Sequence, residues 1–364
     1  MAATSHIEWT DTTWNPVVGC LMVSPGCANC YAEIMAKRLK AMALADIAKG
    51  RDPGRKRHYI EAIGDNGKWS GKLIPVPDAL EDPLGWKTPR MVFVNSMSDL
   101  FYGDDADRKR CEAKGIDFTP VPFEFIDKVF ASIALADRHT AQILTKRPER
   151  MADYFDASRQ EAGIGRDAYV EGEAQNLWHR RTGEDPSMWL AVHFPLPNVW
   201  LGTSVEDQKH ADERIPHLVR CPAAVRFLSC EPLLGPLDLS RWLAIERDRN
   251  GAWRRKSKFH EEPLIGWVIV GGESGHGSRP CNIVWIRDIV AQCAAAGVPC
   301  FVKQLGARPE LFEVFTADGI PLAGIFPGSI ASFQPIVLRD SKGGDWNEWP
   351  ADVRVRQFPA GART

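Results

Sequence analysis

The chain alternates short apolar runs with longer stretches whose apolar residues recur at helical spacing. The apolar runs are three to five residues long, and polar residues follow them. They cover residues 91–95, 141–145, 199–203, 225–229, 267–270 and 300–302. Continuous runs of this kind are typical of strands buried on both faces of a parallel sheet. Helical spacing predicts helices over residues 31–49, 123–136 and 285–296.

The first predicted helix has one apolar side. Its spacing places Lys37, Arg38 and Lys40 outward, and Gly50 predicts its end. The apolar side is expected to consist of Ile34, Met35, Leu39, Met42 and Ile47.

Polar residues follow nearly every predicted strand. Six or seven strand-and-helix units of this kind predict an α/β fold with a full or partial TIM-type (β/α) barrel, whose ligands gather at the carboxyl ends of the strands. A doubly wound open sheet is the alternative, but it would concentrate polar residues at one switch point. We expect a single domain over residues 1–364, with insertions at approximately 156–197 and 241–263.

The composition indicates a globular protein but does not identify a binding partner. The 364 residues are 44% hydrophobic and 25% charged, which is typical of a globular protein with a large core. His6, Glu8, Asp11 and Asn15 interrupt any apolar run that could serve as a signal peptide, and no stretch is long enough for a membrane span. We therefore expect a cytoplasmic protein with no membrane partner. A net charge of -2 argues against non-specific coating of nucleic acid.

Three cysteines lie close together near the N-terminus, with the spacing C-x6-C-x2-C. Cys27 and Cys30 can converge on one ion or cluster, and a Pro-Gly turn can fold Cys20 back toward them. A structural zinc site needs four ligands, whereas a 4Fe-4S cluster on three cysteines leaves one iron open. His6 and His58 keep zinc as an alternative. The other six cysteines are single and are expected to be packing residues: Cys111, Cys221, Cys230, Cys281, Cys293 and Cys300.

Two further motifs each have more than one explanation. The loop from Gly271 to Gly277 follows a strand but has no G-x-G-x-x-G register, so a dinucleotide site is not expected. A tight ligand-lining loop and a purely structural loop are the two remaining interpretations. The basic segment from Arg254 to Lys258 lies between aromatic residues and could contact a nucleic-acid backbone. A solvated insertion is the alternative that we prefer.

The motifs as a set resemble the phage-associated three-cysteine-motif family of unknown function. The resemblance spans nearly the whole chain. It is carried by Cys20-x6-Cys27-x2-Cys30-Tyr31, Val94-Asn-Ser-Met-Ser-Asp99, Leu144-Thr-Lys-Arg-Pro148, Leu228-Ser-Cys-Glu-Pro-Leu-Leu-Gly235, Val268-Ile-Val-Gly-Gly-Glu-Ser274, Phe301-Val-Lys-Gln304 and Gly343-Gly-Asp-Trp-Asn-Glu-Trp-Pro350. That family is in turn similar to the radical S-adenosylmethionine superfamily, nearest to its spore photoproduct lyase branch.

The resemblance implies an enzyme with a partial barrel and a 4Fe-4S cluster on Cys20, Cys27 and Cys30. S-adenosyl-L-methionine would bind the open iron, an electron donor would reduce the cluster, and a 5'-deoxyadenosyl radical would result. From their positions after the strands, eight residues are expected to line the cofactor cavity: Ser96, Ser98, Asp99, Lys146, Thr203, Ser204, Glu206 and Glu273. No catalytic residue is assigned.

The substrate is unknown, and the DNA-lesion branch makes a nucleic acid or nucleobase the first candidate by analogy. Two alternatives remain open. One is a non-enzymatic zinc or iron-sulfur module that binds nucleic acid or protein. The other is a redox or sensory iron-sulfur protein that keeps the barrel but never cleaves the cofactor. In the superfamily, a Gly-Gly-Glu sequence after the second strand holds the amino group of the cofactor. Here Gly271-Gly272-Glu273 follows a much later strand, which leaves cofactor binding open.

Overall fold

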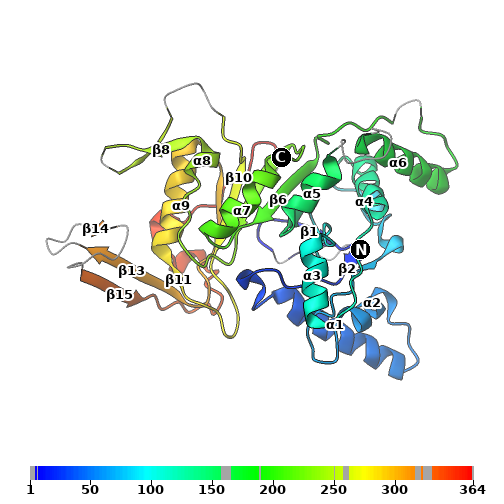
Figure 1. The fold of residues 1–364 in the computed structure, drawn as a ribbon, viewed down its shortest axis with the longest axis horizontal. Helices are drawn as coiled ribbons and strands as arrows, with labels where there is room; N and C mark the ends of the chain where they lie inside the picture. The colour runs from blue at the N-terminus through cyan, green and yellow to red at the C-terminus, as the bar shows by residue number, and fades with distance from the viewer. Residues whose placement is uncertain are drawn as a thin grey trace. The chain divides into compact units, whose positions relative to one another are not determined.

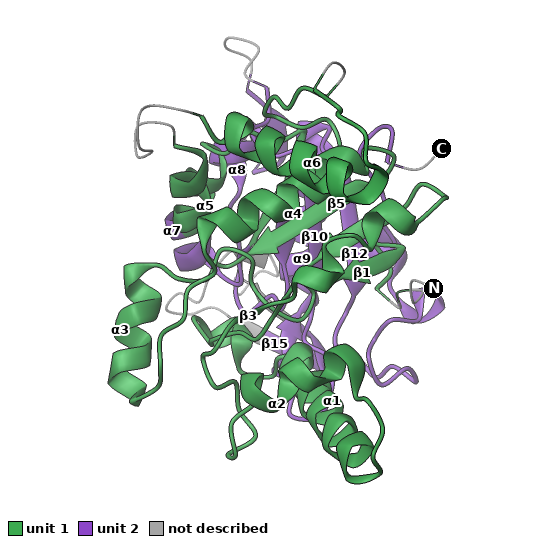
Figure 2. Cartoon of the chain, turned by 90° about the vertical axis from the view of Figure 1, so that its right-hand side faces the viewer, with its two compact units in different colours: residues 1–203, 214–226 green, residues 204–213, 227–364 purple. Residues whose placement is uncertain are grey.

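The chain divides into two compact units, which Figure 2 shows in green and purple. Unit 1 comprises residues 1–203 and 214–226, and unit 2 comprises residues 204–213 and 227–364. The computed structural model describes residues 5, 7–156, 165–187, 190–249, 251–256, 262–315, 321–322 and 330–362.

Unit 1 is built on parallel strands in the order β1, β4, β5 and β6. These strands are Thr12–Trp14, Met91–Val94, Thr140–Thr145 and Val199–Ser204, and Ser204 is the first residue of unit 2. The register aligns Trp14 with Val94, and Val94 with Ile143. Every residue of β4 and β6 is buried, as expected for strands covered on both faces. The carboxyl ends of neighbouring strands therefore lie side by side.

Helices and short turns follow these strands in unit 1 (Figure 1). The cysteine loop runs from β2 (Val17–Val18) through the 3-10 turn η1 (Pro25–Cys27) to α1 (Tyr31–Ala48). The other elements are η2 (Gly54–Arg57), α2 (His58–Ala62), β3 (Ile74–Pro75), η3 (Pro77–Ala79), η4 (Pro83–Gly85), α3 (Asp105–Lys114), α4 (Phe123–Leu135), α5 (Pro148–Phe155) and α6 (Arg166–Thr182). Helix α7 (Gln208–Leu218) has residues in both units.

Unit 2 has three parallel strands in the order β7, β10 and β12. They are Val225–Cys230, Trp267–Gly271 and Cys300–Gln304, and the first two residues of β7 belong to unit 1. A second sheet pairs β11 (Cys281–Asn282) and β15 (Ile330–Pro335) with β13 (Pro309–Phe315), which also pairs with β14 (Pro321–Leu322). The remaining elements are α8 (Ser240–Leu243), β8 (Ile245–Arg247), β9 (Trp253–Arg255), α9 (Ile283–Ala296), η7 (Trp346–Glu348) and η8 (Ala351–Val353).

The α/β class and the predicted strands and helices are confirmed within a few residues at each end. Strand β1 was not predicted, because its three residues, Thr-Thr-Trp, carry no apolar run. The described parts of the two expected insertions contain α6 and the β8–β9 hairpin. Within the described ranges, no helix is both long enough and apolar enough to pass through a membrane.

The prediction for the buried side of α1 is wrong for four of its five residues. Ile34, Met35, Met42 and Ile47 are exposed, with Ile34 at 51%, whereas Leu39 is partly buried and packs as predicted. The helix instead buries Ala32, Ala36 and Ala43, and the first two pack with Tyr59 and Ala62 of α2. Small side chains allow two helices to approach closely, so packing against α2 decides which side is inward.

Candidate functional site

The cysteine loop begins at a glycine that no other residue can replace without strain. Gly19 has a φ of +104°, and it forms a parallel bridge with Ser98 after β4. A Cβ at this position would lie 2.1 Å from the Lys72 carbonyl oxygen. The entry of the loop is therefore fixed by backbone contacts on two sides.

The three thiols of the loop differ from the other six in their surroundings. Cys20, Cys27 and Cys30 are half-buried, whereas the remaining cysteines are buried in the two cores. The Cys20 Sγ lies 3.8 Å from the Leu21 carbonyl oxygen, and the Cys27 Sγ lies 3.9 Å from the Ser24 Oγ. The expectation that the six single cysteines are packing residues is confirmed.

Burial raises the pKa of two of the three thiols. At Cys20, burial is the largest effect; Arg147 lowers the pKa, and Asp99, Cys27 and Cys30 raise it. At Cys30, burial again raises the pKa, and Cys27 adds to that effect. The neighbouring cysteines thus act on the pKa of both Cys20 and Cys30.

The start of α1 and a neighbouring lysine oppose the effect of burial at Cys30. This cysteine is the N-cap of α1, so the first backbone N–H groups of the helix face its thiol. Backbone N–H groups of Glu33 and Ala32, and then Lys146, lower the Cys30 pKa. A helix N-terminus and a cation both favour the thiolate, which is the form that ligates metals.

The described residues contain no group of three His, Cys, Asp or Glu side chains gathered tightly enough to hold one ion. Half-buried thiols at C-x6-C-x2-C spacing, with cations and a helix N-terminus beside them, nevertheless have the donor chemistry of a thiolate-ligated cluster. His6, considered for zinc, lies outside the described residues.

A buried ion-pair network ties the loop to the carboxyl end of β5. The Arg147 Nη1 donates to Asp99 at 2.8 Å, and its Nε donates to Asp107 at 2.6 Å. Its Nη2 donates to the Leu21 carbonyl oxygen at 3.1 Å, one residue after Cys20. The side chains of Arg147, Asp99 and Asp107 are all at most 7% exposed. Arg147 is therefore a positioning residue for the cysteine loop.

Asp99 serves as the acceptor at the centre of this network. Besides Arg147, its carboxylate accepts from Phe101 N (3.1 Å), Thr145 Oγ1 (2.7 Å) and Lys146 N (3.0 Å). Four donors thus share its two oxygens, which leaves it the geometry of a structural anchor rather than an open ligand.

Ser96 and Ser98 link the end of β4 to both ends of the cysteine loop. The Ser98 hydroxyl donates to the Val17 carbonyl oxygen at 2.7 Å, two residues before Gly19. The Ser96 carbonyl oxygen accepts from the Tyr31 hydroxyl at 2.7 Å, directly after Cys30. Both serines therefore lie beside the loop, as their position after the strand predicts.

Asn15 belongs to the site but was not predicted from the sequence. The one feature that could have indicated it is its position directly after β1. Its Oδ1 accepts from Ser96 Oγ at 3.2 Å and from Met97 N at 2.9 Å. Because β1 itself was not predicted, neither was the polar residue at its carboxyl end. Trp9, which precedes this strand, and Trp14, its last residue, are buried in the core.

The remaining predicted residues divide between the two units. In unit 1, the buried Thr203 hydroxyl donates to the Thr145 carbonyl oxygen at 2.8 Å. In unit 2, Ser204 and Glu206 are buried, and the Glu206 Oε2 lies 3.6 Å from His210 Nδ1. Glu273 is held by Arg279, whose Nη2 and Nε lie 2.5 and 3.0 Å from its two oxygens.

The Gly-Gly-Glu loop of unit 2 is tightly packed. A Cβ on Gly272 would lie 2.3 Å from the Leu305 carbonyl oxygen, and one on Gly271 would lie 3.0 Å from the Gln304 carbonyl oxygen. This close approach explains both glycines by backbone packing. Tight packing of this kind favours a structural role for the loop over a dinucleotide site.

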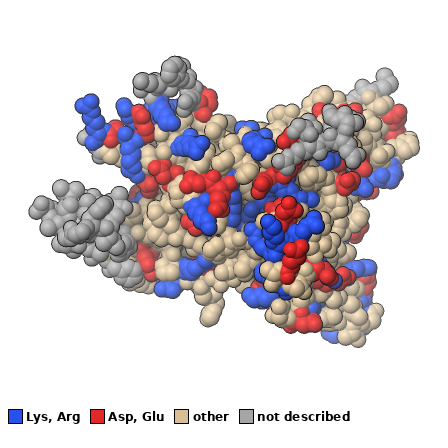
Figure 3. Space-filling model, viewed as in Figure 1, with Lys and Arg blue, Asp and Glu red and all other residues tan. Residues whose placement is uncertain are grey.

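The basic segment after β8 is compensated by acidic neighbours. Arg254 pairs with Glu246 at 2.8 Å, and Arg255 pairs with Glu262 at 3.0 Å. Lys and Arg side chains lie among Asp and Glu on the face shown in Figure 3. These pairs favour the solvated-insertion interpretation. Lys258 lies outside the described residues.

The fold and the site define an α/β protein with a three-cysteine loop at the carboxyl ends of parallel strands. The chain belongs to the family described as Protein of unknown function (DUF5131), which matches residues 4–319. No curated protein and no solved structure matches it. The family description assigns no activity.

Proposed function

We propose that the protein is a radical-SAM-like iron-sulfur enzyme on a partial (β/α) barrel, with Cys20, Cys27 and Cys30 holding a 4Fe-4S cluster. The main support is the anchoring of the cysteine loop. Gly19 bridges to Ser98, Leu21 accepts from Arg147, and Tyr31 donates to Ser96. Each anchor lies just beyond the carboxyl end of β4 or β5, where α/β proteins hold their ligands.

The charges around the thiols support a cluster with a net negative charge. Arg147 lowers the pKa of Cys20, and Lys146 lowers that of Cys30. The first N–H groups of α1 face the same site. These groups stabilise thiolate ligands without being ligands themselves. The Lys146 charge would also attract a cofactor carboxylate bound beside Cys30.

When bound and reduced by an electron donor, such a cluster supplies the electron that cleaves S-adenosylmethionine to a 5'-deoxyadenosyl radical. The proposed cofactor-binding residues of unit 1 are Ser96, Ser98, Lys146 and Thr203, and Asp99 orients Arg147 and the Lys146 backbone. The proposed cofactor-binding residues of unit 2 are Ser204, Glu206 and Glu273. The substrate that we propose is a nucleic acid or nucleobase, in a cytoplasmic setting.

Electron paramagnetic resonance tests this proposal. The full chain is reconstituted anaerobically with iron and sulfide, reduced with dithionite, and measured with and without S-adenosylmethionine. We expect about four irons per chain and a signal whose shape changes when the cofactor binds the open iron. A matched sample of Cys27→Ala shows which part of the signal depends on the loop.

The other outcomes identify the alternatives. A cluster signal that ignores the cofactor would replace the enzyme by a redox or sensory protein. Zinc at one per chain, with no iron retained after reconstitution, would replace it by a zinc module.

A further inference from the structure

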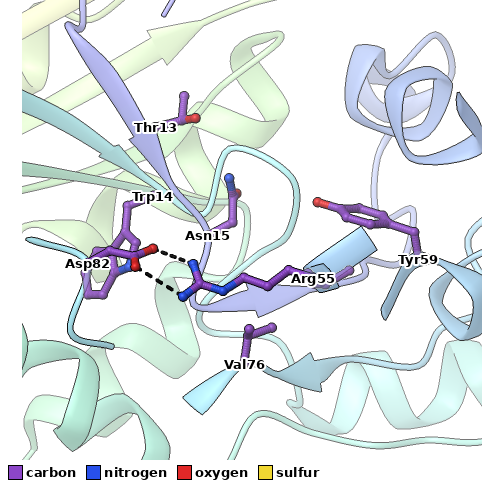
Figure 4. Close-up of a pocket in the computed structure, with 8 residues that line it drawn as sticks. Thr13, Trp14, Asn15, Arg55, Tyr59, Val76 and Asp82 are labelled. Carbon is purple, nitrogen blue, oxygen red and sulfur yellow. Dashed lines mark hydrogen bonds and ion pairs between the residues drawn. The ribbon is translucent and has the colours of Figure 1, made fainter. Parts of the chain in front are cut away.

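Unit 1 contains a half-open cavity lined by both polar and apolar side chains, and Val18 of its wall lies two residues before Cys20 (Figure 4). Its volume is about 210 Å³. At ~30 Å³ per water molecule in the liquid, this is the space of about seven waters. Trp14, Val18 and Val76 supply its apolar walls. A molecule of roughly ten heavy atoms would fit, provided that its polar atoms find partners.

Three polar side chains of the cavity wall each have a polar group that makes no hydrogen bond with the described residues. Within the described ranges, no hydrogen bond uses the hydroxyl of Thr13, the hydroxyl of Tyr59 or the amide nitrogen of Asn15. The Asn15 Oδ1 is already held by Ser96 and Met97, which fixes its amide plane. Burial raises the Tyr59 pKa to about 12, so its hydroxyl keeps the proton that it can donate.

Among the described residues that line the cavity, the only cation is Arg55, and it is already paired with carboxylates. The Arg55 Nη1 and Nη2 lie 2.5 and 3.1 Å from the two carboxylate oxygens of Asp82. Its Nε donates to Asp78 at 3.0 Å. This lining has no unpaired positive charge for a phosphate or carboxylate. It therefore matches an uncharged ligand, with the guanidinium plane and the Tyr59 ring as flat surfaces.

We propose that this cavity binds a neutral, planar heterocycle of nucleobase size through Thr13, Asn15 and Tyr59. Asn15 donates to a ring nitrogen or carbonyl oxygen, and the two hydroxyls donate or accept. A sugar of similar size would leave the aromatic and aliphatic walls without an apolar partner, and a free phosphate would meet no available cation.

The cavity is connected to both ends of the cysteine loop. Val18 lies in its wall two residues before Cys20, and Asn15 holds Ser96, whose carbonyl oxygen accepts from Tyr31 after Cys30. As a statement about the substrate, the inference rests on the proposed function. As a statement about a binding site, it is measurable on iron-free protein.

The test measures binding of free adenine, hypoxanthine, cytosine and uracil to the full iron-free chain by ligand-observed nuclear magnetic resonance. Tyr59→Phe removes one hydroxyl but keeps the ring that packs beside Ala62. Thr13→Val removes another hydroxyl at nearly constant volume. Each loses about one hydrogen bond, so each should raise Kd about three- to tenfold. Tyr169→Phe, at an exposed tyrosine of α6, is the matched control.

Saturable binding of a base that both cavity variants weaken and Tyr169→Phe leaves unchanged supports the inference. Absence of saturable binding to the folded wild-type chain overturns it, as does an equal Kd in Tyr59→Phe. Binding is measured without iron, whereas the cluster is measured by paramagnetic resonance after reconstitution. Failure of either proposal is thus visible without failure of the other.

Discussion

The Arg147 guanidinium lies 2.8 Å from the Asp99 carboxylate, and both side chains are buried. The same guanidinium donates to Asp107 and to the Leu21 carbonyl oxygen. A buried cation with two carboxylates leaves one negative charge in excess, which Arg110 offsets at 3.1 Å from Asp107. The cysteine loop is thus attached to a charge network that is costly to dismantle.

Arg147→Lys should weaken the attachment of the loop. An ammonium keeps the charge but cannot reach Asp99, Asp107 and Leu21 together. We expect a loss of about 2 kcal/mol in the free energy of unfolding and a lower iron content after reconstitution. The matched control is Arg150→Lys, because Arg150 donates to Tyr102 and Val121 instead of to the loop. Full iron content in Arg147→Lys would contradict the positioning role.

Cys27→Ala should abolish iron binding and leave most of the fold intact. Cys27 is half-buried in the loop, so losing its thiol leaves no large cavity. Cys293→Ala, in the core of unit 2, should lower stability by about 1 kcal/mol and retain full iron. The measurement is the iron content per chain of the two variants after reconstitution. Equal iron loss in both would refute the ligand assignment.

Gly19→Ala should destabilise unit 1 more than Gly50→Ala does. Both glycines have positive φ, so an alanine at either costs about 1–2 kcal/mol in backbone strain. Only at Gly19 does the added Cβ also meet backbone, 2.1 Å from the Lys72 carbonyl oxygen; at Gly50 it meets nothing within 4 Å. Urea unfolding gives the free energy of unfolding of each variant, and the difference between the two variants is the cost of the clash at Gly19. An equal loss of stability in both would show that the backbone around Gly19 moves to accept the Cβ.

His139 should make the protein less stable in mild acid. Burial lowers its pKa, and its Nε2 donates to the Pro83 carbonyl oxygen at 3.1 Å as a neutral ring. Its contribution to stability is therefore present above the unfolded pKa of about 6.5 and is lost as pH falls through the lower folded value. Between pH 7 and pH 5, the free energy of unfolding should fall more steeply in wild type than in His139→Gln. If the free energy of unfolding changes equally with pH in both proteins, His139 is not the cause of the lower stability in acid.

Local patterns were sufficient to predict most of the parallel strands and the longer helices. The residues of β4 and β10 form unbroken apolar runs, and α4 has strong helical spacing, so their positions follow from the sequence. Strand β1 has only three residues, and it is a strand because β4 offers it a parallel partner. The buried side of α1 was mispredicted because the small alanines pack more closely than the larger apolar residues.

The sequence alone determined the cysteine loop, the strand-and-helix rhythm and the polar residues that follow each strand, because these depend on residue type and spacing along the chain. Only the tertiary structure decided that Arg147 holds Leu21, that Asp99 is filled by four donors, and that Asn15, Tyr59 and Thr13 share one cavity. These arrangements bring together residues far apart in the chain, such as Leu21 and Arg147, which are 126 positions apart. Parallel pairing aligns the carboxyl ends of β1, β4 and β5, and the packing of α2 adds Tyr59, and no local pattern specifies either.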